Sequence, residues 1–314
     1  MKQPSVNIIK RVILSIIRRL FQILMLPFWK VQYIHTGKIA LCCIAKLEND
    51  YIRFFVEYYK NLHFDKIIIY DNNDPDDERF DDVIGDYMRS QFVEIVDFRG
   101  KVSPLFEAYQ DFYDRFYKEY DWMAFFDCDE FLTFVDGTDD IHTFMNQKVY
   151  QSYQAVHFNW MVFGDNEILD SDGRNVIERF KNPILPYEFK TPYRSFPENN
   201  HIRTILRGGL KGIKWIDSPH SPRNKYYRCC NPSGSPASFS SSRNSIDFNK
   251  AYIRHYSTKT IGEWVKNKMK RGDAIFTGDE GLRATSFEAF YRYNKKTEEK
   301  VKYAERLMKV LSNK

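Results

Sequence analysis

The chain has 314 residues, enough for one large hydrophobic core or for one core with a small appendage. Aromatic residues make up 17% of it, so core material is plentiful, and the modest net charge of +5 excludes a dedicated nucleic-acid binder. The 5 cysteines have neither the number for a disulfide framework nor the spacing of zinc ligands. We expect a reducing compartment and buried thiols at every cysteine except Cys128, whose backbone lies inside an acidic motif.

The amino-terminal residues 1–36 differ in kind from the rest. Residues 6–29 are apolar but carry four bases at 10, 11, 18 and 19, which argues against a spanning helix. A clean apolar core and a small-residue cleavage site are missing, which excludes a secretory signal. Because the bases recur near two helical turns apart, we expect a basic amphipathic helix on the surface of an anionic membrane. A domain-packing helix or a disordered leader is the alternative.

Apolar strands and amphipathic helices alternate through the first half of the chain. This alternation predicts an α/β fold with a mostly parallel, doubly wound sheet flanked by helices. The predicted strands cover 39–45, 66–70, 92–98 and 122–126, and the predicted helices cover 50–61, 81–90 and 104–119.

The second half is less regular. We expect a core domain over 37–280, followed by a charged carboxyl-terminal helix within 281–314. Residues 231–245 are low in complexity and predict a mobile loop. The predicted strands cover 155–163, 210–216 and 251–256, and the predicted helices cover 175–180, 261–271 and 287–311.

An acidic motif follows the apolar strand at 122–126. Residues two apart in extended chain point to one side, so Asp127 and Asp129 can converge on one point. Two adjacent carboxylates repel unless a positive group lies between them, which favours a hard divalent cation carrying a phosphorylated ligand. The alternative is a solvated strand end. Neither a GxGxxG nor a Walker loop is present, which argues against dinucleotide redox chemistry and P-loop phosphoryl transfer.

An ordered series of motifs resembles the GT-A glycosyltransferases of the family 2 type, and most closely a family 92-like branch. The resemblance covers roughly residues 38–275 and implies a GT-A, Rossmann-like fold with a less regular acceptor-side second half. Leu47 departs from the pattern, because the family usually has Asn there. The motifs are 45–52 (AKLENDYI), 69–73 (IYDNN), 126–131 (FDCDEF), 160–164 (WMVFG), 177–180 (IERF), 253–259 (IRHYSTK) and 268–272 (KMKRG).

The resemblance implies a nucleotide-sugar site that uses Mn²⁺ or Mg²⁺. Asp129 would hold the metal, Asp127 would face the ribose and belong to the metal set, and His255 would supply a further metal ligand. A buried strand histidine is the alternative for His255. The donor site would comprise Ala45, Glu48, Asp71, Asp127, Cys128, Lys259, Lys268 and Arg271, with Asp71 at the uracil or ribose and the last three residues near the diphosphate.

An inverting transfer also needs a base for the acceptor hydroxyl. Glu178, Asp165 and Asp217 are the candidates, and Glu178 is preferred because it lies in a family-like motif. The alternative for Glu178 is a surface acid paired with Arg179 or Arg174.

The resemblance implies an enzyme that moves a hexose from a UDP-sugar to a glycan or lipid-linked acceptor, in the synthesis of a cell-surface polysaccharide. We expect it in the cytoplasm, held through residues 6–29 at the cytoplasmic face of the membrane. A metal-dependent nucleotidyl or phosphoryl transferase and a catalytically silent membrane-associated scaffold are the alternatives.

Overall fold

The computed structural model describes residue 17 and residues 35–184, 198–216, 218–223, 227–238 and 246–312. The predicted amino-terminal helix therefore lies outside the described residues, except for Ile17. No described helix is both long enough and apolar enough to cross a membrane. The domain boundaries at 36 and 280 stay predictions.

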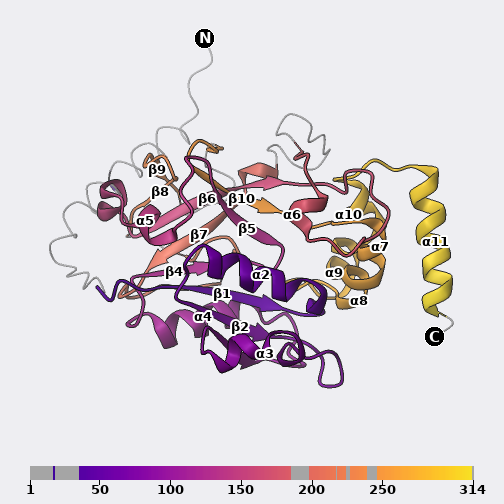
Figure 1. Ribbon diagram of the computed structural model, residues 1–314, viewed down its shortest axis with the longest axis horizontal. Coiled ribbons are helices and arrows are strands. Elements are labelled where there is room, and N and C mark those ends of the chain that lie inside the picture. The colour runs from indigo at the N-terminus through magenta and orange to yellow at the C-terminus, as the bar shows by residue number, and fades with distance from the viewer. Residues whose placement is uncertain are drawn as a thin grey trace, which may run out of the picture.

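The first half forms the predicted parallel sheet, and helices cover it (Figure 1). Strands β3, β2, β1 and β4 lie side by side in that order and are parallel to one another. The strands are β1 (Ile39–Ala45), β2 (Lys66–Asp71), β3 (Val93–Asp97) and β4 (Trp122–Phe125). The helices are α2 (Asn49–Asn61), α3 (Asp81–Arg89) and α4 (Leu105–Phe116).

Two apolar cores lie on the two faces of this sheet. All seven residues of β1 are buried, as expected for a parallel strand covered on both sides. Alternate residues point to opposite faces, so Leu41 and Cys43 join one core while Ala40 and Cys42 join the other. Helix α2 covers the first face, and α4 covers the second. The five cysteines are all buried, with no disulfide among them.

The second half extends the sheet with strands of both directions. The order continues from β4 through β7, β6 and β10 to β5. Strand β7 is antiparallel to β4 and β6, whereas β10 is parallel to β6 and antiparallel to β5. The sheet is therefore mixed, although its first half is wholly parallel. The added strands are β5 (Glu130–Phe134), β6 (Ala155–Val162), β7 (Ile202–Arg207) and β10 (Ala251–His255), with the short pair β8 (Cys229–Cys230) and β9 (Pro236–Ala237).

The predicted strand at 210–216 is wrong. Gly209 and Gly212 adopt left-handed φ values of 76° and 72°, which interrupt an extended chain. The strand in this region is β7, and sequence reading missed it because it contains two arginines. Both are buried: Arg203 faces carboxylates, and Arg207 packs over the Trp122 ring at 4.0 Å.

The carboxyl-terminal part contains several helices rather than one over 287–311. The chain turns at 292–297, so α10 and α11 are separate. Together with α7 they bury a third apolar cluster, and they lie at the opposite end of the molecule from β8 and β9 (Figure 1). The elements are α5 (Ile141–Met145), α6 (Val176–Arg179), α7 (Ile261–Glu263), a π-helical turn (Trp264–Lys268), α8 (Met269–Arg271), α9 (Gly278–Ala284), α10 (Phe287–Tyr291) and α11 (Glu298–Ser312), with 3-10 turns at Lys148–Ser152 and Glu198–Asn200.

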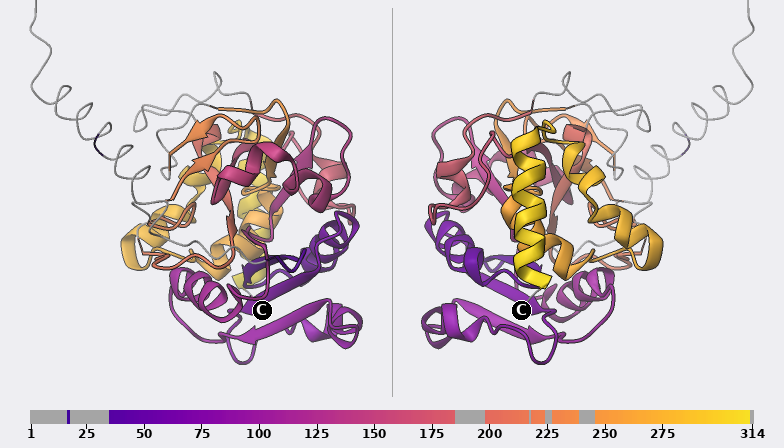
Figure 2. Two further views of the ribbon diagram at one scale, coloured as in Figure 1. Left: turned by 90° about the vertical axis from the view of Figure 1, so that its left-hand side faces the viewer. Right: turned by 90° about the vertical axis from the view of Figure 1, so that its right-hand side faces the viewer.

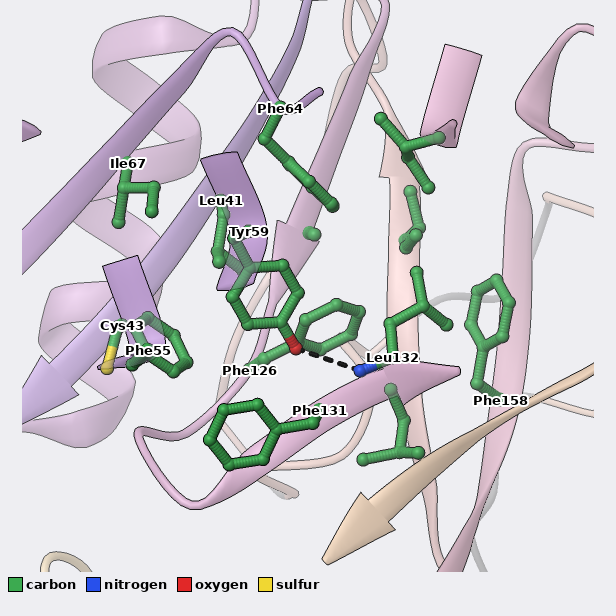
Figure 3. Packing of buried hydrophobic residues seen from close by; sticks show 14 of the residues in the cluster. Leu41, Cys43, Phe55, Tyr59, Phe64, Ile67, Phe126, Phe131, Leu132 and Phe158 are labelled. Atoms are coloured by element: carbon green, nitrogen blue, oxygen red, sulfur yellow. Dashed lines mark hydrogen bonds between the residues drawn. The ribbon is translucent and has the colours of Figure 1, made fainter. Parts of the chain in front are cut away.

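A tyrosine on α2 fixes the start of β5, directly after the acidic motif. The Tyr59 hydroxyl donates to the Glu130 carbonyl at 2.8 Å and accepts from the Leu132 amide at 3.1 Å. Figure 3 shows this second bond among the packed rings of Phe55, Phe126 and Phe131. The first half of the chain lies on one side of the molecule and most later segments on the other in both views of Figure 2. Tyr59 therefore holds the acidic motif where the two halves meet.

Candidate functional site

A cavity of about 280 Å³ lies where the strand ends of the two halves meet. Ala45 at the end of β1, Asn72 after β2, and the acidic motif after β4 line it from the first half. Trp160 of β6 and His255 of β10 line it from the second half. Ligands of open α/β sheets bind beyond the carboxyl ends of such strands, so this cavity is the candidate site.

Asp127 belongs to a buried ion-pair network. Phe125 pairs with Thr204 in the antiparallel register of β4 and β7, which places Arg203 beside the acidic motif. Arg203 contacts Asp127 through Nη2, and its Nε lies 2.7 and 2.6 Å from the two carboxylate oxygens of Glu130. The Tyr109 hydroxyl donates to the other Asp127 oxygen at 2.9 Å. Both oxygens of Asp127 therefore have partners, which fixes its orientation in the cavity wall.

Asp129 and His255 form the part of the site best suited to a metal. The antiparallel register of β5 and β10 places His255 opposite Glu130, and the His255 Nε2 lies 3.7 Å from Asp129 Oδ1. Ligand atoms of Asp129, Glu130 and His255 all lie within 4.8 Å of one another. A buried group of Asp, Glu and His can thus hold a metal, although Glu130 is also held by Arg203.

The charge states of these two residues suit a hard divalent cation. Burial alone would raise the pKa of Asp129, but His255, Lys259 and Lys268 together hold it below its ordinary value. Burial lowers the pKa of His255 to about 4; nearby Asp129 opposes this shift, while Arg203, Lys268 and Lys259 add to it. Asp129 is therefore an anion and His255 a neutral imidazole at neutral pH. These are the forms that coordinate Mn²⁺ or Mg²⁺.

Cationic side chains gather on the other side of Asp129. Lys268 and Arg271 line the cavity, and Lys268 has no ion-pair partner within the described part of the chain. Arg271 pairs with the buried Glu48, and Lys259 Nζ lies 3.9 Å from the second Glu48 oxygen. Glu48 thus holds two cations in place, and it also lines the cavity. Lys259 lies behind the cavity wall and packs over the Tyr51 ring at 4.3 Å.

Asp71 organises a loop, and its neighbour Asn72 lines the cavity. One Asp71 oxygen accepts from the Asn73 amide and side chain, and the other pairs with Arg99 at 2.9 Å. Asn72 donates to the carbonyls of Phe98 and Lys101, and its side-chain oxygen has no donor among the described residues. The structure therefore brings Asn72, rather than the predicted Asp71, to the cavity.

The predicted donor-site residues at the end of β1 and in the acidic motif do reach the cavity. Ala45 and Cys128 line it, and both are buried. Burial raises the pKa of the Cys128 thiol, so this residue contributes shape rather than charge. Leu47, where the related pattern has Asn, adopts a left-handed φ of 54°, a conformation that Asn tolerates better than Leu.

The predicted bases do not reach the cavity. Glu178 is exposed on α6, while its neighbour Arg179 is buried and pairs with Glu263. Asp165 is buried elsewhere, where Lys300 of α11 approaches it at 2.6 Å. Asp217 lies outside the described residues. Neither described candidate is therefore placed to receive a proton from a ligand in this cavity.

The cavity residues that were not predicted as site residues include Trp160, Arg203 and His220. Trp160 opens one of the motifs of the resemblance, so it could have been singled out. Arg203 lies in the strand that sequence reading missed, and His220 follows it in an irregular segment. No local pattern marks these two residues, because only the pairing of β7 with β4 brings them to the acidic motif.

Comparison with known proteins completes the description. A structure of S. aureus TarS 1–349 matches at 11% identity over 82% of this chain and 70% of that chain, with a TM-score of 0.38. The mannosyltransferase PcManGT from Pyrobaculum calidifontis, in complex with GDP-Man and Mn²⁺, matches at 9% identity over 96% and 86%, with a TM-score of 0.36. Against another structure of S. aureus TarS, this chain covers only 23% of that chain, at 11% identity and a TM-score of 0.30.

No curated protein matches the chain. The model of glycosyltransferase family 92 matches residues 40–306, and the chain therefore belongs to glycosyltransferase family 92.

Proposed function

We propose that this glycosyltransferase moves a hexose from a UDP-sugar to a glycan or lipid-linked acceptor, with inversion and with Mn²⁺ or Mg²⁺. One observation carries the proposal. The buried pair Asp129 and His255 and the cation Lys268, which is unpaired among the described residues, line the same cavity at the strand ends. A metal pair beside a free cation is the arrangement that a diphosphate leaving group requires.

The leaving-group chemistry follows from these positions. As the bond from the anomeric carbon to phosphate breaks, negative charge grows on the nucleoside diphosphate. A bound divalent cation, held by Asp129 and His255, supplies Lewis-acid stabilisation of that charge. Lys268 and Arg271 stabilise the same charge electrostatically from the cavity wall. Burial keeps these charges away from bulk water, where they would be screened.

The other cavity residues that come from the first half of the chain suit a uracil nucleoside. Ile44 and Leu105 offer apolar surface to a base, and Asn72 lines the same cavity. The Asn72 amide group is held by two carbonyls, so its oxygen is presented as an acceptor. The N3–H of uracil is a matching donor. This match favours UDP over a nucleotide with no ring N–H at that edge.

We further propose that the acceptor belongs to a cell-surface polysaccharide, and that residues 6–29 hold the enzyme at the cytoplasmic face of the membrane. The support is the basic amphipathic pattern of that segment, which suits an anionic surface. Sedimentation with anionic vesicles tests this part. A chain without residues 1–36 should stay in the supernatant under conditions that pellet the full chain.

UDP release from a panel of UDP-sugars tests the catalytic proposal. We expect activity with Mn²⁺, loss of activity with EDTA, and a fall of about 10²- to 10³-fold for Asp129→Asn, because one carboxylate ligand is lost. Asp136→Asn is the matched control, since Asp136 is an exposed turn residue that accepts from Thr138. Equal UDP release by the wild type and Asp129→Asn would show that the site is wrongly assigned.

A further inference from the structure

The described cavity lacks an obvious proton acceptor for the acceptor hydroxyl. Asp127 is held by Arg203 and Tyr109, Glu48 is held by Arg271, and Asp129 belongs to the metal pair. Of the carboxylates and imidazoles that line the cavity, Asp273 and His220 remain. If the proposed function holds, either Asp273 or His220 receives the proton of the acceptor hydroxyl.

His220 is held rigidly beside the acidic motif. The carbonyl of Pro219 accepts from Arg203 Nη1 at 2.7 Å, and the His220 carbonyl accepts from the Thr204 hydroxyl at 2.8 Å. The His220 ring stacks on His201 with centroids 4.7 Å apart and planes 10° apart. Its other neighbour is the Trp160 ring, at 4.9 Å and nearly perpendicular. The backbone and the ring are thus both fixed, as preorganised acid–base chemistry requires.

The ring of His220 is available as a proton acceptor. Burial lowers its pKa well below the ordinary value, and the nearby His201, Arg203 and His255 lower it further. The imidazole is therefore neutral in the empty cavity. The backbone of Ile202 partly offsets this lowering of the pKa, and a neutral imidazole keeps one ring nitrogen with a lone pair. A bound diphosphate adds negative charge to the cavity and so increases the basicity of that nitrogen.

The position of His220 relative to the cations also favours it. In an inverting transfer the nucleophile approaches the anomeric carbon from the side opposite the leaving group. Lys268 acts on Asp129 and His255 electrostatically, whereas the neighbours that act on His220 are His201, Arg203 and His255. His255 therefore interacts with both Lys268 and His220. Proton transfer to His220 requires a leaving group drawn toward Lys268 and a nucleophile on the His220 side.

Asp273 is less well placed for this role. One of its oxygens accepts from the amides of Ile275 and Phe276, and its charge acts on Arg271. It therefore belongs to the cationic wall, on the side of the leaving diphosphate. A carboxylate there would compete with the leaving group rather than assist the nucleophile.

We infer that His220 is the catalytic base of the transfer. Its unprotonated ring nitrogen takes the proton of the acceptor hydroxyl as the oxygen forms its bond to the anomeric carbon. The bond from that carbon to the diphosphate oxygen breaks, and its electron pair leaves with the nucleoside diphosphate. The products are the glycoside, the nucleoside diphosphate and an imidazolium, which returns its proton to water. Trp160 and Pro219 form the wall of the acceptor subsite beside the base.

Transfer kinetics of His220→Asn and His220→Gln test the inference, with the UDP-sugar and acceptor glycan that the wild type uses. We expect kcat for transfer to fall about 10²- to 10⁴-fold, the usual contribution of a general base. The donor KM and the Mn²⁺ concentration for half activation should stay within about two- to three-fold, because neither residue change touches the metal pair. Added imidazole should restore part of the rate of His220→Ala. His63→Asn is the matched control, since His63 is an exposed histidine with a left-handed φ of 62° that Asn tolerates.

The outcomes separate the inference from the function on which it rests. A wild type that releases UDP from no UDP-sugar overturns the proposed function, and the inference falls with it. An active wild type whose His220→Asn and His220→Gln variants keep kcat within about three-fold overturns the inference alone. A raised donor KM at unchanged kcat, or a collapse of kcat in Asp273→Asn with His220 intact, also overturns it. UDP and Mn²⁺ should still raise the thermal stability of each variant, which shows that the site is folded.

Discussion

The two halves of the sheet contribute different chemistry to one cavity. The parallel half brings strand ends that lie near one another in sequence, and it offers backbone, apolar surface and an amide at Ala45, Ile44 and Asn72. The mixed half brings Trp160 and His255 from strands that are far apart in the chain. The proposed nucleoside contacts therefore come from one local part of the chain, whereas the proposed reacting groups are brought together by long-range strand pairing.

Histidines of the two halves also differ in burial. The parallel half has an exposed histidine at position 63, whereas His157 and His255 lie on buried strands of the mixed half. Ion pairs follow it too. Asp71 and Arg99 both belong to the parallel half, but Arg203 joins a strand of the mixed half to the acidic motif of the parallel half. The junction between the halves thus depends on buried charge.

The largest effect is expected from removing the arginine at this junction. Arg203→Met removes the guanidinium from the buried Glu130 and the half-buried Asp127, which should cost about 3–5 kcal/mol of unfolding free energy. Arg99→Met is the control within one half and should cost less, about 1–3 kcal/mol, because Asn73 still donates to Asp71. Urea unfolding measures both changes. Equal losses would contradict the view that the junction is the critical ion-pair site.

The free energy of unfolding should depend on pH through His157, which is buried on strand β6 of the mixed half of the sheet. Burial lowers the pKa of His157 to about 3, with a backbone hydrogen bond to Ser238 opposing the shift. The unfolded state, with an ordinary pKa near 6.5, binds the proton first as the pH falls, so stability decreases from about pH 6.5 downward. The loss from this group should reach roughly 3 kcal/mol by pH 4.

Urea unfolding at a series of pH values measures this dependence. His157→Gln should flatten it, whereas His63→Asn in the parallel half should leave it unchanged. A slope that is the same in both variants and in the wild type would assign the acid sensitivity to other groups.

The smallest effect is expected from removing single tyrosine hydroxyls. It distinguishes a hydroxyl that acts on the cavity from one that contributes to stability alone. Tyr109→Phe removes the hydroxyl that donates to Asp127, and Tyr70→Phe removes one that donates to Asp111 at 2.7 Å, away from the cavity lining. Each should cost about 1 kcal/mol of unfolding free energy. Only Tyr109→Phe should also lower the rate of transfer, by several-fold, because Asp127 loses its fixed orientation. Equal rates in the two variants would mean that the Asp127 orientation does not matter to catalysis.

Local pattern predicted much of the parallel half. Its strands and helices are confirmed within a few residues, because each apolar run or helical face is buried where its periodicity indicated. The acidic motif, Ala45 and His255 were predicted and do line one cavity. The pairing of Asp127 with Arg203 could not be read in advance, because Arg203 lies 76 residues later.

The sequence alone determined the elements whose burial is decided by neighbours a few residues away, and with them the fold class and the group of acids at a strand end. Only the tertiary structure decided which groups face the cavity. Asp71 and Asn72 are adjacent in sequence, yet only Asn72 lines the cavity. The carboxylate of Asp71 is instead paired with Arg99 and Asn73. Glu178 lies in a family-like motif but is exposed, and His220 lies in an irregular segment but reaches the site. The physical reason is that a buried charge takes its role from its partner, and partners are assigned by strand pairing across the chain.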